Sequence, residues 1–272
     1  MSDASALLSS GQSASIVRLD DGWALEIDGL RQSHVGRDDE PSPHATVRWM
    51  LAALASPLTA SPAPRVAHLG GAAMSLPRQV AHARPDAQQV VVELEPAIVD
   101  LVVRHAPPPP GVEVVVGDAR AWLDAAPPAS LDAIAIDVYA GGRIPPPFTS
   151  LECATAAHAA LADDGVLVTN GVAGPELAFT AAHLASLEAA FAHTALVVQG
   201  SVLAGARFGN AVLVASRAPI ASDRIRAALA GDAARGALVD DVSRIVGDAV
   251  PMRDADERWS PEPIRAAFIP PA

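Results

Sequence analysis

The sequence predicts an α/β protein built around a largely parallel sheet. Four short apolar runs between Arg65 and Asp137 each end in glycine or a carboxylate, and they recur roughly every 20 to 25 residues. The segments between these runs can form helices, and strands that alternate with helices are typical of parallel sheets covered on both faces. Ligands bind at the carboxyl ends of such strands, so the same pattern predicts where a site lies.

The elements of this sheet follow one another in a regular order. Strands are expected at 65–70, 89–94, 112–116, 132–137 and 165–170, and helices at 75–84, 96–105, 118–125, 150–162 and 175–192. Two further strands near 194–201 and 209–215 flank a turn-rich connection, which favours a C-terminal antiparallel hairpin. By analogy, five parallel strands followed by such a hairpin match the Rossmann-like class I methyltransferase sheet.

The N-terminal part predicts a small β-meander. Apolar-polar alternation over residues 14–34 is interrupted by Asp-Gly turns at 20–22 and 28–29, which are strong hairpin signals. A helix is expected from His44 to Leu58. The predicted organisation is a disordered tail at 1–12, the meander and linking helix at 13–60, a Rossmann-like nucleoside-binding domain at 61–218, and C-terminal helices with a proline-rich tail at 219–272.

Composition narrows the classes of function. The 272 residues carry a formal net charge of −12, which argues against a nucleic-acid partner. All 19 basic residues are arginine, so a Schiff-base lysine and a lysine-bearing phosphate loop are excluded. The histidines and the single Cys153 have no metal-ligand spacing, and no metal is expected. We see no membrane span or signal peptide, and a cytoplasmic protein is expected.

Gly70, Gly71 and Glu93 are candidates for nucleoside binding. The two glycines follow one predicted strand and precede a helix, so the backbone there can approach a ligand closely. Glu93 ends the next strand, at the spacing at which doubly wound folds hold a ribose by its hydroxyls. A tight strand–helix turn would equally explain the glycines, and a helix dipole would explain an acid.

Three further candidates follow the next two strands. Asp118 opens a helix, where it can accept a hydrogen bond from an adenine amino group, cap the helix, or do both. Asp137 ends an apolar strand beside a flexible turn and is placed to act as a base or to hold an amine; capping of the strand end is the alternative. Tyr139 either lines the same site or belongs to the core.

The chain resembles the spermidine synthase family, the polyamine aminopropyltransferases, from about residue 14 to residue 216. The matching segments are Asp28-Gly29-Leu30-Arg31-Gln32, Asp39-Glu40 with His44, Gly70-Gly71-Ala72-Ala73-Met74-Ser75, Val92-Glu93-Leu94-Glu95, Gly117-Asp118-Ala119, Asp137-Val138-Tyr139-Ala140 and Pro147-Phe148-Thr149-Ser150-Leu151-Glu152. Their order and spacing carry the resemblance.

The resemblance implies a class I methyltransferase-like core with an N-terminal β-sheet lid, and a homodimer. It implies a decarboxylated S-adenosylmethionine donor and a small polyamine acceptor. The residues that would bind the nucleoside are Gln32, Gly70, Gly71, Glu93, Asp118 and Ala119. Asp137 and Tyr139 would be catalytic, and His44 and Tyr139 would contact the acceptor.

Two departures from the family pattern bear on the reaction. The aspartates that bind the donor and acceptor amines in the family are Ala73 and Ala140 here. An ammonium buried without its carboxylate costs several kcal/mol, so polyamine synthesis is not the expected activity. Because an aspartate at 73 would repel the carboxylate of intact S-adenosylmethionine, alanine there suggests that the intact donor is accepted.

The sequence therefore leaves three hypotheses. The first is a transferase that moves a methyl or aminopropyl group from S-adenosylmethionine or its decarboxylated form. The second is a non-catalytic relative that binds a nucleoside, such as methylthioadenosine, or serves as a scaffold. The third, a nicotinamide-dependent oxidoreductase, fits Gly70 and Glu93 but lacks the third glycine of the dinucleotide fingerprint, since Ser75 and Leu76 stand there.

Overall fold

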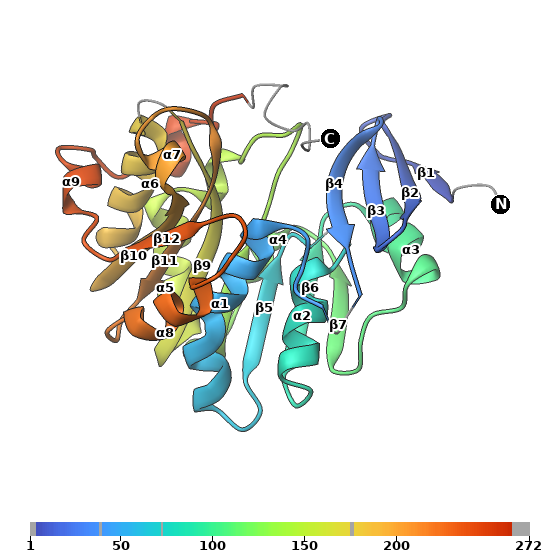
Figure 1. Ribbon diagram of the computed structural model, residues 1–272, viewed down its shortest axis with the longest axis horizontal. Coiled ribbons are helices and arrows are strands. Elements are labelled where there is room, and N and C mark those ends of the chain that lie inside the picture. Colours follow the sequence, from blue (N-terminus) through green and yellow to red (C-terminus); the bar gives the residue numbers. More distant parts are fainter. Residues whose placement is uncertain (1–3, 38–39, 72, 175–176, 263–272) are drawn as a thin grey trace.

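The computed structural model describes residues 4–37, 40–71, 73–174 and 177–262 (Figure 1). Within these ranges the strands form two sheets. The smaller sheet is antiparallel and lies at the N-terminal end of the chain, with its strands in sequence order. These strands are β1 (Ser5–Leu7), β2 (Ser13–Leu19), β3 (Gly22–Ile27) and β4 (Leu30–Val35).

The larger sheet has the order β12-β10-β11-β9-β8-β5-β6-β7. Strands β5 to β9 are mutually parallel, β11 pairs antiparallel with both β9 and β10, and β12 pairs antiparallel with β10. The bounds are β5 (Arg65–Leu69), β6 (Gln88–Glu93), β7 (Val112–Val116), β8 (Leu131–Ile136), β9 (Leu161–Ala173), β10 (His193–Gln199), β11 (Gly209–Ser216) and β12 (Gly236–Val239). The predicted parallel sheet with a C-terminal antiparallel hairpin is confirmed.

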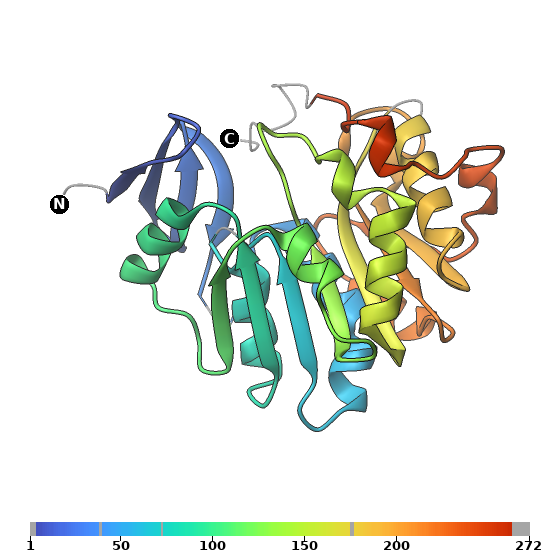
Figure 2. The ribbon, with the colours of Figure 1, turned by 180° about the vertical axis from the view of Figure 1, so that it is seen from behind.

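Helices cover both faces of the large sheet. On one face α1, α2 and α8 contribute to one apolar cluster, and on the other α4, α5 and α6 contribute to a second (Figures 1 and 2). The helices are α1 (Ala45–Ala60), α2 (Ser75–Ala83), α3 (Pro96–His105), α4 (Ala119–Asp124), α5 (Leu151–Ala160), α6 (Ala178–Glu188), α7 (Gly200–Leu203), α8 (Ser222–Leu229) and α9 (Ser243–Val246), with 3₁₀ turns η1 (Pro146–Phe148) and η2 (Asp254–Asp256).

The N-terminal sheet packs on α3 through a third apolar cluster (Figure 1). One face of the sheet supplies Ala14, Ile16 and Leu25 to this cluster, and α3 supplies Ile98 and Leu101. Because a short antiparallel sheet is only marginally stable by itself, this packing holds the sheet beside the carboxyl ends of β5, β6 and β7.

Two elements differ from the sequence-based expectation. Residues 4–12 were expected to lie in a disordered tail, but β1 pairs with β2 and Leu8 is buried in the third cluster. C-terminal helices were expected after residue 218, with no further strand, but β12 lies between α8 and α9 and pairs with the outer edge of β10. Both strands are too short for a periodic signal, and pairing with another strand, β2 or β10, decides their conformation. Residues 1–3 and 263–272 lie outside the described ranges.

Candidate functional site

The predicted site residues gather at the carboxyl edge of four adjacent strands. Gly70 follows β5, Glu93 ends β6, Asp118 follows β7 and Asp137 follows β8, in the spatial order β8-β5-β6-β7. Three backbone hydrogen bonds of 2.9 Å keep these ends in register; they run from Asp137 N to Leu69 O, from Gly70 N to Val92 O and from Gly117 N to Glu93 O. The edge therefore presents a glycine turn flanked by three carboxylates.

The turn after β5 requires glycine for a steric reason. Gly70 has a φ of 74°, and a Cβ placed there would lie 2.4 Å from the carbonyl oxygen of Asp137. A Cβ at Gly71 would lie 2.5 Å from Cγ1 of Val91. Side chains are thus excluded where β5 leaves the sheet, and the backbone itself faces the site.

Glu93 and Asp118 are both held by backbone amides. The two carboxylate oxygens of Glu93 accept from Gly71 N at 3.3 Å and from Glu95 N at 3.2 Å. Asp118 caps α4, and its Oδ1 accepts from Arg120 N at 2.8 Å and from Ala121 N at 3.0 Å. The expectation that Asp118 caps the helix is therefore confirmed. Its side chain remains exposed, and capping with one oxygen is compatible with ligand binding through the other.

Asp137 is the most electrostatically perturbed carboxylate of the group. Asp137 is exposed at the edge of the sheet, yet the protein packed around its carboxyl group desolvates it and raises its pKa above the ordinary 3.8. A hydrogen bond of 2.8 Å from Asn170 Nδ2 to Asp137 Oδ1 lowers the pKa in part, and the charge of Glu93 raises it again. A carboxyl group with a raised pKa is better matched to proton transfer near neutral pH.

Tyr139 lies close enough to Asp137 for the charge of that carboxylate to affect the pKa of the phenol. Burial, and then that charge, raise the pKa of the phenol well above its usual value. The hydroxyl is buried and has no hydrogen-bond partner among the described residues. A buried hydroxyl without a partner is uncommon, and this one belongs to a side chain packed against the main apolar cluster.

The remaining predicted residues have different settings. Gln32 is exposed on β4, with its Nε2 donating to Leu30 O at 3.1 Å, while Ala119 is buried in the first turn of α4. His44 is the N-cap residue of α1, 6.1 Å from His34 between ring centroids. Burial lowers the pKa of His44, and the neighbouring positive charges of His34, Arg31 and Arg48 lower it further. The neutral ring has a buried Nε2 without a partner in the described part of the chain.

The two alanines that replace family aspartates lie in contrasting places. Ala140 directly follows Tyr139 in the chain. It is exposed and forms an isolated β-bridge with Arg143. Ala73 is fully buried in the apolar cluster beneath the N-terminal sheet. An aspartate at 73 would therefore enter that cluster, so the argument that alanine relieves repulsion of the donor has no geometric support. Asp39 and Ala72, which also carried the resemblance, lie outside the described residues.

Sequence reasoning missed three residues at this edge. Asn170, near the end of β9, is 7% exposed and fixes Asp137, while its Oδ1 has no described partner. Its position at the carboxyl end of an apolar strand was a usable signal. Leu94 and Val116 are apolar yet 68% and 50% exposed, beside Glu93 and Asp118. Exposure of this kind cannot be read from sequence.

Other features of the described residues lie away from this edge. A cavity of about 580 Å³ is lined by the amino-terminal starts of β5, β6 and β7 together with Trp122, at the opposite edge of the sheet. The described residues contain no group of three or more side chains suited to hold a metal ion. None of the described helices is long and apolar enough to cross a membrane.

Comparison with known proteins places this geometry in context. No protein-family model and no curated protein matches the sequence. Among solved structures, a probable spermidine synthase from Corynebacterium glutamicum matches with a TM-score of 0.84 and 26% identity, over 93% of this chain and 96% of that chain. A spermidine synthase in complex with the transition-state analogue AdoDATO matches with a TM-score of 0.60 and 17% identity, over 90% of this chain and 86% of that chain.

A third match extends the likeness to methyltransferases. Human methyltransferase-like protein 13, in complex with SAH, matches with a TM-score of 0.54 and 21% identity, over 68% of this chain and 86% of that chain. This match covers about two thirds of the chain, and the spermidine synthases match over nearly the whole chain. From its sheet order, its N-terminal antiparallel sheet and these likenesses, we conclude that the chain has a spermidine-synthase-like class I methyltransferase fold.

Proposed function

We propose that the protein is a transferase that uses an S-adenosylmethionine-type donor. The observation that carries the proposal is the row of carboxylates at successive strand ends around the glycine turn at Gly70. Glu93 would hold the ribose hydroxyls and Asp118 the adenine amino group, because carboxylates accept hydrogen bonds from both. The exposed side chains of Leu94 and Val116 would pack against the base. The solved structures in complex with AdoDATO and with SAH support an S-adenosylmethionine-type ligand.

The proposed reaction is a direct displacement at a carbon next to the sulfonium. The lone pair of the acceptor forms the new bond, the carbon–sulfur bond breaks, and its electrons remain on sulfur as a neutral thioether. Asp137 would take the proton that the acceptor loses, and its raised pKa favours that role. Asn170 would keep Asp137 Oδ1 in place, and the hydroxyl of Tyr139 would contact the acceptor.

We further propose that the acceptor is not an ordinary polyamine. Ala140 offers no carboxylate to a second ammonium at the edge of the site, and a buried ammonium without such a partner is unfavourable by several kcal/mol. A small acceptor that presents a single nucleophile would avoid this cost. Whether a methyl or an aminopropyl group moves depends on the donor. The expected homodimer and cytoplasmic location are also proposals, and light scattering on the purified chain tests the first.

Calorimetric titration tests the proposed donor site. S-adenosylmethionine, its decarboxylated form and methylthioadenosine would be titrated into the wild-type chain and into Asp118→Ala. Loss of the adenine contact should weaken donor binding by about tenfold or more, since one hydrogen bond to a charged group contributes about 1.5–3 kcal/mol. Asp124→Ala is the matched control, because Asp124 lies on the same helix with a half-exposed side chain.

The pattern of binding separates the alternatives. Preference for the intact donor indicates methyl transfer, and preference for the decarboxylated donor indicates aminopropyl transfer. If methylthioadenosine alone binds, the chain is a nucleoside-binding relative without the proposed transfer. If none of the three binds, the donor site is absent and a scaffold role replaces the transferase proposal.

A further inference from the structure

The β8–α5 loop, residues 138–150, follows Asp137 and contains a short turn at Ala140–Arg143, a proline run and η1. Gly141 and Gly142 have φ values of 59° and 78°, a conformation open to few other residues. Pro145, Pro146 and Pro147 carry no backbone N–H, so this part of the loop can accept hydrogen bonds but cannot donate them. Phe148 N and Thr149 N donate to Pro145 O and Pro146 O within the loop, whereas Pro147 O is bound by a donor from elsewhere in the chain.

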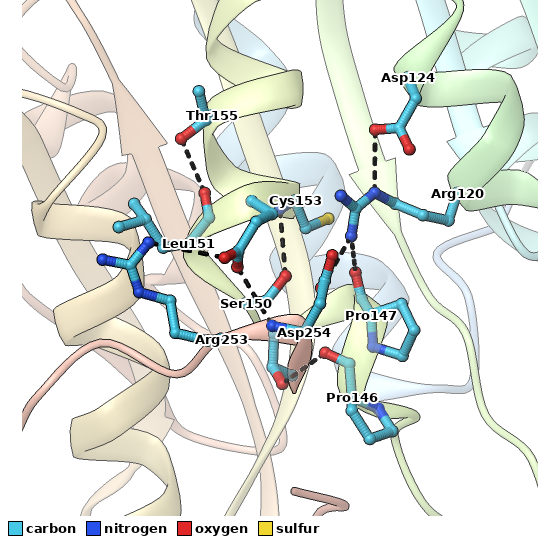
Figure 3. Close-up of polar contacts among 12 residues, drawn as sticks. Arg120, Asp124, Pro146, Pro147, Ser150, Leu151, Cys153, Thr155, Arg253 and Asp254 are labelled. Carbon is cyan, nitrogen blue, oxygen red and sulfur yellow. Dashed lines mark hydrogen bonds and ion pairs between the residues drawn. The ribbon is translucent and has the colours of Figure 1, made fainter. Parts of the chain in front are cut away.

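Arg120 supplies such a hydrogen-bond donor from the part of the site beside Asp118. It lies on α4, two residues after Asp118, and its side chain is only 15% exposed. The Nη1 group donates to Pro147 O at 2.9 Å and to Asp254 Oδ1 at 3.0 Å, while Nε donates to Asp124 Oδ1 at 3.0 Å (Figure 3). One guanidinium thus joins α4, the proline-rich part of the loop and the C-terminal segment.

The C-terminal segment 251–262, which we call the strap, contacts both the loop and the first turn of α5 that follows it. Met252 accepts from Leu151 N at 2.8 Å, and Asp254 N donates to Glu152 Oε2 at 3.2 Å. Ser260, which is fully buried, accepts at its Oγ from Ile144 N at 2.9 Å. These contacts lie at both ends of the proline run.

Arg143 completes the second anchor. Its Nε donates to Ser260 O at 2.6 Å, and its guanidinium lies 5.7 Å from the centroid of the Trp259 ring. Ser260 N also donates to Ile144 O at 3.2 Å. Arg143 is therefore engaged with the strap.

We propose that Arg120 is a positioning residue and that, together with the strap, it holds the β8–α5 loop where Asp137 and Tyr139 need it. This inference rests on the proposed function for its catalytic meaning. Its structural content is independent of any ligand: the loop is hydrogen-bonded to strap residues up to 117 positions away. The strap is then part of the active site although none of its residues touches the reacting atoms.

Hydrogen–deuterium exchange of the full chain without ligand tests the inference. The variants are Arg120→Met, which keeps the aliphatic stem and removes the donors, and the milder Asp254→Ala. Amides of residues 140–150 should exchange at least about tenfold faster in Arg120→Met, equal to about 1.4 kcal/mol of lost local stability. Asp124→Ala is the matched control, because it removes the contact of Arg120 within α4 and leaves the loop and strap contacts in place.

The outcomes decide the inference separately from the proposed function. Faster exchange confined to the loop and strap, with recovery in Asp254→Glu, supports it. Unchanged loop exchange in both variants overturns it, and so does an increase spread evenly over the large sheet. Titration with S-adenosylhomocysteine, run in parallel, should give dissociation constants within about threefold of wild type for Arg120→Met. If wild type binds no donor, the proposed function fails while the exchange result still decides the role of the strap.

Discussion

At the scale of single residues, Asp137 shows how surroundings tune one carboxylate. It keeps contact with solvent, yet the protein around it raises its pKa, and Asn170 on the neighbouring strand holds one of its oxygens. Glu93 and Asp118, at the two adjacent strand ends, are instead held by backbone amides. Three acids at one edge of the sheet therefore have different chemical settings and are suited to different roles.

Asp137→Asn should lower the transfer rate without destabilising the folded chain. The amide cannot take a proton, so transfer should fall by about 100-fold or more. The amide oxygen can still accept from Asn170, and the neutral group avoids the desolvation cost, so the thermal midpoint at pH 7 should rise. Calorimetry and a transfer assay on the same preparation check both effects. Unchanged transfer would remove Asp137 from the mechanism.

The pH dependence of this variant follows from the direction of the shift. Because the folded-state pKa of Asp137 is raised above 3.8, the folded chain binds this proton more firmly than the unfolded chain does. Its contribution to stability is present at low pH and is lost as pH rises through the raised pKa. The stability advantage of Asp137→Asn should therefore appear over that range and be absent below the ordinary pKa. Urea unfolding at a series of pH values measures it.

Gly70→Ala should damage both fold and site. The residue has a φ of 74°, and the added Cβ would meet Asp137 O at 2.4 Å, so the turn must shift or remain strained. A loss of about 1–3 kcal/mol in unfolding free energy is expected, with weaker donor binding. Gly200→Ala is the control, since a Cβ there has no atom within 4 Å. Equal stability of the two variants would contradict the steric argument.

At the scale of elements, the N-terminal sheet depends on one capping carboxylate. Glu95 caps α3 by accepting from Ala97 N at 3.3 Å, and it also accepts from Ser9 N at 3.0 Å and from the Ser9 hydroxyl. The helix start and the β1–β2 connection are thereby tied together. This contact and the burial of Leu8 add to the pairing of β1 with β2 in ordering residues 4–12.

Glu95→Ala should loosen the N-terminal sheet from α3. Loss of an N-cap contact costs about 1 kcal/mol, and limited proteolysis should cut before residue 13 sooner than in wild type. The hydrogen bond from Ser9 is the main cause that lowers the pKa of Glu95. The stabilisation is therefore present above the ordinary pKa and is lost as pH falls through the lowered one. Ser9→Ala, which leaves the α3 cap intact, shows how much of the effect belongs to the sheet.

At the scale of the whole molecule, an ion pair joins α1 to the segment between α8 and β12. Arg48 donates to Asp232 at 2.7 and 3.2 Å, and the side chain of Asp232 is only 6% exposed. Arg48 also donates to Ser42 O and Pro43 O, at the entry to α1. The C-terminal part of the chain is thus locked onto the first helix of the core.

Asp232→Ala should cost about 3 kcal/mol, because it leaves the largely buried Arg48 without its carboxylate. The hydrogen bond from Arg48 lowers the pKa of Asp232, so the stabilisation is lost as pH falls through that lowered value. Asp163→Ala is the control, since Asp163 pairs with Arg217 at 2.9 Å but is 95% exposed; a change within about 0.5 kcal/mol is expected there. Denaturant unfolding compares the two, and equal losses would contradict the role of burial.

The sequence predicted well those features that depend on neighbouring residues. The apolar runs located β5 to β9, and the acids at their ends gave the row formed by Glu93, Asp118 and Asp137. The strands β1 and β12 were missed, because three or four residues hold no periodicity and only pairing with β2 or β10 orders them. The contact between Asn170 and Asp137 was missed for a similar reason, since it spans 33 residues.

By itself, the sequence determined the succession of strands and helices and the placing of acids at strand ends, because hydrophobic periodicity and turn chemistry act over a few residues. Only the tertiary structure decided the burial of Ala73, the raised pKa of Asp137, the missing partner of the Tyr139 hydroxyl and the contacts of Arg120 with the strap. Burial, desolvation and hydrogen-bond partners depend on atoms brought together from distant parts of the chain, and no local pattern encodes them.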